Sequence, residues 1–87
     1  MPDPTEFTRF NVHEEMWMEA LNDIGTTEKL PGFPLSQAQI DGPDERWLQE
    51  NDAGFTVAQA IFRYKEDLDS GIPLEHCLHG IPPSQRG

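Results

Sequence analysis

The chain has 87 residues, and its sixteen Asp and Glu outnumber its six Lys and Arg, so the formal net charge is −10 at pH 7. This length holds one domain with one core, and the 36% of hydrophobic residues, which include two Trp and five Phe, argue against a fully disordered chain. The charge disfavours direct binding to nucleic acid or to an anionic membrane, because like charges repel, and favours a protein partner with a basic surface.

The cysteine content and the short apolar runs predict a cytoplasmic protein. Cys77 is the only cysteine, so it has no partner for a disulfide within the chain. No apolar run exceeds the three residues of Met16 to Met18, far short of the roughly 20 residues that cross a bilayer, and no secretion signal is recognised. We therefore expect a reducing cytoplasm and no membrane span.

Residues 1–10 are expected to form an irregular N-terminal arm. Pro2 and Pro4 stand between polar residues and interrupt regular structure. Phe7 and Phe10 follow, and their rings are expected to attach the arm to the core.

The first main helix is predicted over about residues 12–24. Asn11 and Glu14 have the spacing of a capping box, in which each side chain accepts a hydrogen bond from the backbone amide of the other residue. Gly25 is expected to end the helix in the left-handed conformation. Apolar residues recur every four positions, with two more beside them, and form one broad face: Val12, Met16, Trp17, Ala20, Leu21 and Ile24.

Residues 25–42 are predicted to be mainly loop, because their Pro and Gly residues interrupt long helices and paired strands. Leu30, Phe33 and Leu35 are expected to fold back over the core. Ser36 and Gln39 repeat the capping-box spacing and predict one helical turn ending near residue 40.

A short helix is predicted from Pro43 to about residue 50, because Pro suits a first helical position and acidic residues follow it. It carries Trp47 and Leu48.

The second main helix is predicted over residues 57–69. Thr56 and Gln59 form another capping box, and Ser70-Gly71 ends the helix. The apolar stripe of this helix has the helical spacing and consists of Val57, Ala60, Ile61, Tyr64 and Leu68. Pro73 begins a further short helix that bears Leu74 and Leu78 and stops at Gly80.

These elements together predict an all-α fold. It is a small single-domain bundle of two main helices, about 12–24 and 57–69, with short helical turns and a Pro/Gly-rich loop. The helical domain covers residues 11–80, and residues 81–87 form a flexible C-terminal tail.

Among the possible chemical functions, metal binding has the most support from the sequence, although that support is weak. His76, Cys77 and His79 lie close together, but a structural zinc site needs four ligands, and His13 is the only other His or Cys in the chain. We expect instead a buried or half-buried Cys77 beside two surface histidines, and no cofactor.

Catalysis is not expected. A cysteine nucleophile would need a histidine across a cleft, and only His13 is far enough from Cys77 in sequence. Carboxylate pairs arise by chance among sixteen acidic residues, and no glycine-rich phosphate loop or basic patch is present.

Two large apolar side chains fall outside the main faces of their helices. At 100° per residue, Met18 lies about 150° from the centre of the first face, and Phe62 about 135° from the second stripe. Either a second core layer covers them or they are exposed, and exposed apolar residues mark a contact surface, including one between copies of the chain.

Negative charge is also segregated. The first helix carries Glu14, Glu15, Glu19 and Asp23 without a compensating base, and on the helical wheel Met18 lies among the glutamates. Two further acidic runs consist of Asp41, Asp44, Glu45, Glu50 and Asp52, and of Glu66, Asp67, Asp69 and Glu75. Such runs serve either to meet a basic partner or only to raise solubility.

The sequence therefore predicts a non-catalytic acidic module that inhibits or regulates one basic protein, for example a nucleic-acid-binding protein blocked by charge mimicry. The alternative is a small accessory subunit that packs on a larger enzyme through its apolar residues. A small metal-binding protein is the third hypothesis. The predicted partner-binding residues are Glu14, Glu15, Met18, Glu19, Asp23 and Phe62.

Overall fold

The computed structural model describes residues 3–43 and 45–77, and every regular element within these ranges is a helix. Their order along the chain is η1 (Pro4–Glu6), α1 (Glu14–Thr27), α2 (Gln37–Asp41), α3 (Glu45–Glu50), α4 (Val57–Asp69) and η2 (Leu74–His76). The prediction of an all-α fold with two main helices is confirmed.

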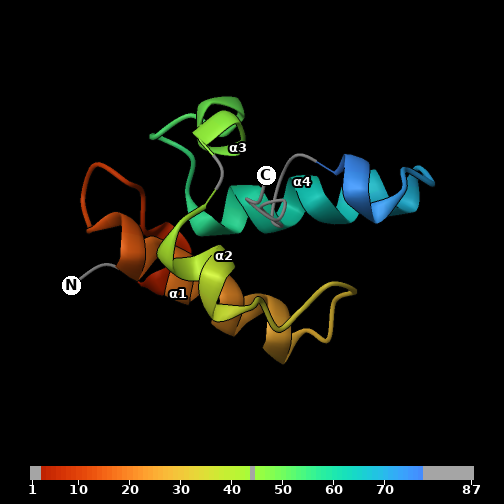
Figure 1. Cartoon of the computed structure of the whole chain (residues 1–87), viewed down its shortest axis with the longest axis horizontal. Helices are drawn as coiled ribbons and strands as arrows, with labels where there is room; N and C mark the ends of the chain where they lie inside the picture. Colours follow the sequence, from red (N-terminus) through yellow and green to blue (C-terminus); the bar gives the residue numbers. More distant parts are fainter. Residues whose placement is uncertain (1–2, 44, 78–87) are drawn as a thin grey trace.

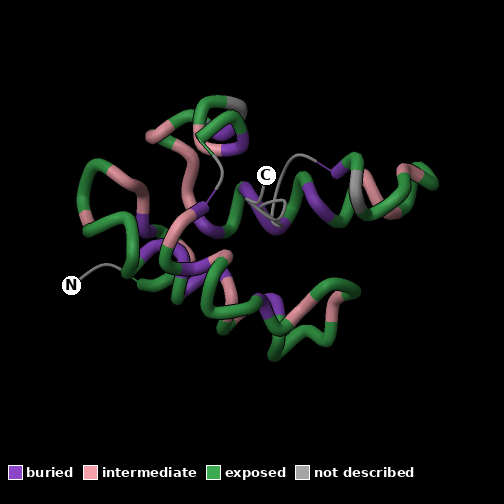
Figure 2. Tube along the Cα trace, viewed as in Figure 1, coloured by how far each residue is buried: buried purple, intermediate pink, exposed green. Residues whose placement is uncertain are grey.

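The two long helices, α1 and α4, pack against each other, and the short turn η1 lies against both. Figure 1 shows α4 running across the molecule with α1 below it and α2 beside α1. Buried residues concentrate where α1, α4 and the N-terminal segment meet (Figure 2). The core therefore lies between the two long helices and is closed by the shorter segments.

Two tryptophans form the centre of this core. Trp17 on α1 and Trp47 on α3 are both fully buried, and their rings meet edge to face with centroids 6.0 Å apart. The indole Nε1 of Trp17 donates a hydrogen bond to the carbonyl oxygen of Phe55 at 3.2 Å. Burial of two such large side chains supplies much of the apolar area that an 87-residue chain needs to fold.

The first helix begins at Glu14, and the predicted Asn11 capping box is wrong. The Asn11 side chain instead accepts a hydrogen bond from the Thr8 amide at 2.9 Å, inside a turn that precedes the helix. His13 is the residue that precedes α1, and its side chain makes no capping hydrogen bond. Because α1 begins at Glu14, Asn11 lies two residues before the N-cap position and its side chain belongs to the earlier turn.

The helix also passes through Gly25, which was expected to end it. Gly25 is buried within α1, and a Cβ atom built on it would overlap the ring of Phe33. The left-handed residue is Lys29, with φ 57°. Hydrogen bonds from the Leu30 amide to the Gly25 carbonyl and from the Lys29 amide to the Thr26 carbonyl, both 3.0 Å, complete a Schellman motif.

The loop after α1 folds back over the core as predicted. Leu35 is buried, and Leu30 and Phe33 are partly buried against the core. The Leu35 amide donates to the Asn22 side chain at 2.7 Å, and the Tyr64 hydroxyl donates to the Pro31 carbonyl at 2.6 Å. These two bonds attach the loop to α1 and to α4.

The other two predicted capping boxes are confirmed. The Ser36 and Thr56 side chains accept from the amides of Gln39 and Gln59, and each Gln side chain accepts from the amide of its cap. The stripe of α4 is buried at Val57, Ala60, Ile61 and Tyr64 and partly buried at Leu68. Ser70 and Gly71, the latter with φ 81°, end the helix as expected.

The N-terminal arm is attached to the body by Phe7 but not by Phe10. Phe7 is buried and its carbonyl accepts from the Val57 amide at 3.1 Å, whereas Phe10 is 79% exposed. The arm also contains the helical turn η1, which the proline spacing did not predict. The arm is thus a structural part of the core.

The predicted Leu78, the Gly80 stop and the 81–87 tail lie outside the described residues, as does Asp44. Within those ranges, no helix combines the length and the hydropathy that crossing a bilayer requires.

Candidate protein-interaction surface

The four acidic residues predicted on the first helix are all on the surface of α1. Glu14, Glu15, Glu19 and Asp23 are exposed, and within residues 3–43 and 45–77 none of them lies in an ion pair. The ion pair near this helix joins Lys65 on α4 to Glu28 just after α1, with Nζ and Oε1 2.5 Å apart. The α1 carboxylates therefore face solvent with their charge uncompensated by neighbouring described side chains.

Met18 does not lie among these carboxylates on the surface. It is 0% exposed and belongs to the same core cluster as Trp17 and Leu21, so it is covered by the main core and not by a second layer. The helical wheel placed the centre of the apolar face wrongly, because α1 is covered by α4, η1 and α2 rather than by a single partner. Because these three elements contact α1 from different sides, they bury a wider part of the α1 surface than the single apolar stripe that the wheel assumes.

Met16, which was assigned to the core face, is 46% exposed instead. It lies in a shallow hollow between η1 and α1, which we call the Met16 hollow. The hollow is lined by Pro4, Phe7, Met16, Glu19, Ala20, Asn22 and Asp23. Two of the predicted partner-binding residues, Glu19 and Asp23, are thus beside an exposed methionine, although not the one predicted.

Phe62 on α4 is 59% exposed, as one of the two alternatives for this residue required. It lines a second shallow hollow with Phe55, Ala58, Gln59 and Arg63. At this exposure, most of the Phe62 ring is in contact with solvent instead of the core. Phe62 is therefore a second apolar element of the surface.

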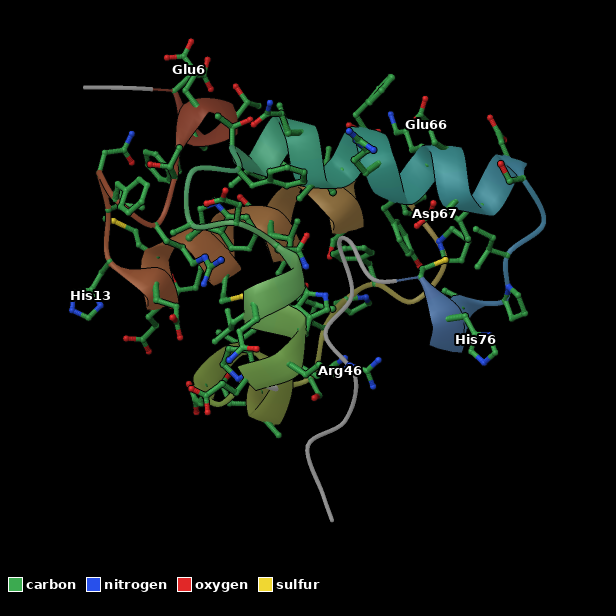
Figure 3. All side chains as sticks on the ribbon, turned by 90° about the horizontal axis from the view of Figure 1, so that it is seen from above. Glu6, His13, Arg46, Glu66, Asp67 and His76 are labelled. Carbon is green, nitrogen blue, oxygen red and sulfur yellow. The ribbon has the colours of Figure 1, made fainter. Side chains whose placement is uncertain are left out.

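Cys77 is buried, at 3% exposure, as expected. Its Sγ lies 3.5 Å from the Pro73 carbonyl oxygen and 3.7 Å from that of Ile72. Burial, and after it the negative charge of Asp67, raises the pKa of the Cys77 thiol. Figure 3 shows Asp67 on the side of α4 toward His76, with Glu66 pointing to the opposite side. A thiol held in the neutral form is a poor nucleophile.

His13 and His76 lie at opposite ends of the molecule (Figure 3). His13 therefore does not meet Cys77 or complete a metal site with His76, and His79 lies outside the described residues. Among the residues that the structure does describe, no three His, Cys, Asp or Glu side chains are grouped to hold a metal ion.

Arg9 is a structural residue that the sequence did not single out. Its guanidinium donates to the backbone carbonyls of Leu48, at 2.9 Å, and of Asn51, and lies 5.9 Å from the centre of the Trp17 ring. It thereby satisfies carbonyl groups at the C-terminal end of α3. Its partners are 39 and 42 residues away, so no local pattern indicates this role.

The chain matches no protein-family model, no curated protein and no solved structure.

Proposed function

We propose that the chain is a non-catalytic acidic module that binds one basic protein and inhibits or regulates it by charge mimicry. The observation that carries this proposal is the row of exposed carboxylates on α1, Glu14, Glu15, Glu19 and Asp23, which no described cation neutralises. Leaving four like charges together opposes folding by self-repulsion, and an oppositely charged partner relieves that repulsion. The cytoplasm, where a free thiol such as that of Cys77 persists, is the compartment we propose.

A binding role also fits the exposed apolar side chains. Interfaces concentrate affinity in a few apolar anchors, whereas charges at the rim mainly accelerate the encounter. Met16 and Phe62 supply such anchors on α1 and α4. Both line hollows that are open to solvent.

The test begins with affinity capture from the native host, followed by purification of the captured protein and measurement of its association rate with this chain. We expect Glu14, Glu15 and Glu19 changed together to Gln to slow association roughly tenfold at low salt and to have little effect at high salt. The matched control removes three charges elsewhere, through Glu45→Gln, Glu66→Gln and Asp69→Asn. If both triple variants behave like the unmodified chain at every salt concentration, charge mimicry through α1 is wrong.

The second candidate is an accessory subunit of a larger enzyme, and the exposure of Phe62 and Phe10 favours it. Such a complex would be held by apolar contact and would respond little to salt. Phe62→Ala would then weaken binding more than the triple Gln variant does. The ratio of these two effects at physiological salt separates the candidates.

A further inference from the structure

We infer that the Met16 hollow receives one apolar side chain from a cationic segment of the partner, with Glu19 and Asp23 binding the Lys or Arg residues that flank it. This inference rests on the proposed function and assigns its contact site. It replaces the Met18 site that helical periodicity predicted.

The arrangement of the hollow follows from helix geometry. Met16, Glu19, Ala20 and Asp23 are spaced by three or four residues and so share one side of α1. Phe7 and Ala20 are each 9% exposed and contribute apolar surface at the base, and Met16 stands half-exposed beside them. Methionine is flexible and polarisable, which suits a contact that must adapt to an incoming side chain.

The polar part of the hollow selects cations. Asn22 also lines it, but its side-chain oxygen already accepts from the Leu35 amide at 2.7 Å and from the Thr26 hydroxyl at 3.4 Å. Glu19 and Asp23, in contrast, are exposed carboxylates one helical turn apart, and like charges at this spacing repel. A cation placed between them removes that repulsion.

The chain's own described cations do not perform this task. Arg9 is bonded to the Leu48 and Asn51 carbonyls, and Lys65 is paired with Glu28. No described Lys or Arg is paired with Glu19 or Asp23. A second copy of the chain is a poor occupant, because it brings a further formal charge of −10. The occupant that fits both surfaces is a basic segment with an apolar residue at its centre.

Short peptides test this site without the natural partner. The probe is acetyl-Lys-Lys-Leu-Lys-Lys-amide, and the two comparison peptides replace its Leu by Gly or all its Lys by Glu. The chain is labelled with ¹³C at the methionine methyl groups and ¹⁵N at the amides, and peptide is added at low salt. We expect the Leu peptide to shift the Met16 methyl signal and the Glu19 and Asp23 amides, while buried Met18 reports that the fold is unchanged. The Gly peptide should bind roughly fivefold more weakly, and the Glu peptide should not bind.

Variants of the chain give the second part of the test. Met16→Ala should reduce the advantage of the Leu peptide over the Gly peptide to less than about twofold. Glu19→Gln with Asp23→Asn should weaken both Lys peptides roughly tenfold at low salt, while Glu66→Gln with Asp69→Asn, which removes the same charge from α4, should have a much smaller effect. The inference is overturned if the Met16 signal does not move or if the Leu and Gly peptides bind equally. That result would leave charge mimicry to be decided by the triple Gln variant and the intact partner.

Discussion

Lys29 and Gly71 occupy the same position in the same motif at the ends of the two main helices. Each is the left-handed residue that follows the helix, with φ 57° at Lys29 and 81° at Gly71. At α4 the Ile72 amide bonds to the Asp67 carbonyl at 3.1 Å, just as the Leu30 amide bonds to Gly25 at α1. The motif is the same, but only Gly71 lacks the Cβ that disfavours this conformation.

Exchanging these residue types should therefore change stability in opposite directions. Lys29→Gly should stabilise the fold by about 0.5 kcal/mol, because relief of the left-handed penalty exceeds the entropy that Gly adds to the unfolded state. Gly71→Ala should destabilise it by about 1 kcal/mol, and since nothing lies within 4 Å of the added Cβ, the effect is purely conformational. Urea unfolding measures both, and two changes of the same sign would contradict the assignment.

Gly25→Ala should destabilise the protein although Ala is the better helix former. The gain in helix propensity is about 1 kcal/mol. The new Cβ would overlap the Phe33 ring, which cannot withdraw freely because it meets Tyr64 edge to face with centroids 6.0 Å apart. Such overpacking costs about 1 to 3 kcal/mol, so we expect a net loss of about 1 kcal/mol. In a Phe33→Ala background, the same change should become stabilising; a loss there as well would assign the effect to something other than the ring.

Met16 and Met18 should respond very differently to truncation. Met18→Ala removes a fully buried side chain and should cost about 2 to 4 kcal/mol of unfolding free energy. Met16→Ala removes a half-exposed one and should change stability by about 0.5 kcal/mol or less. Thermal and chemical unfolding of the two variants, measured side by side, checks the corrected orientation of α1. Equal losses would return Met18 to the surface.

Stability should fall when the protein is made strongly alkaline. Burial, with a smaller contribution from Cys77, raises the pKa of Tyr64 to about 12 from its ordinary value of 10.0. The folded state therefore keeps the phenolic proton that the unfolded state loses, and this contribution is fully present below about pH 10 and is lost as pH rises through about 12. Solvent screening of the partly buried hydroxyl keeps the loss below the roughly 2.7 kcal/mol that two pKa units correspond to.

The tyrosine contribution can be isolated in a Cys77→Ala background, where no thiol titrates. Unfolding by urea is measured from pH 9 to pH 12 with and without Tyr64→Phe. The chain that retains Tyr64 should lose stability more steeply over this range. Parallel curves would show that Tyr64 is not the group responsible.

The sequence predicted hydrogen bonds between residues close in the chain, but not which face of each helix the rest of the fold covers. The Ser36 and Thr56 capping boxes were predicted because all their partners lie within four residues. The Asn11 box had the same spacing and failed, since the Thr8 turn competes for the same side chain. The choice depends on which of two local structures the rest of the chain stabilises, and spacing alone does not contain that information.

The candidate surface was predicted in its charges but not in its apolar anchor. Glu19 and Asp23 are exposed wherever α1 packs, because a carboxylate is costly to bury. Whether Met16 or Met18 is buried depends on which elements cover α1, and those elements come from the N-terminal arm and from residues beyond the loop. The sequence placed Met18 among the acidic residues and Met16 on the core face, and the fold reverses both assignments.

The bonds from Arg9 to Leu48 and Asn51 also constrain how the chain matures on the ribosome. Arg9 is synthesised before its two acceptors, which lie 39 and 42 residues later in the chain. Its hydrogen bonds therefore form only after those residues have been made. The same holds for the hydrogen bond from the Trp17 indole to the Phe55 carbonyl and for the one from the Val57 amide to the Phe7 carbonyl. A nascent chain that has reached only α2 therefore exposes Trp17 without its permanent neighbours. These three contacts of the N-terminal half are therefore complete only after the start of α4 has been synthesised.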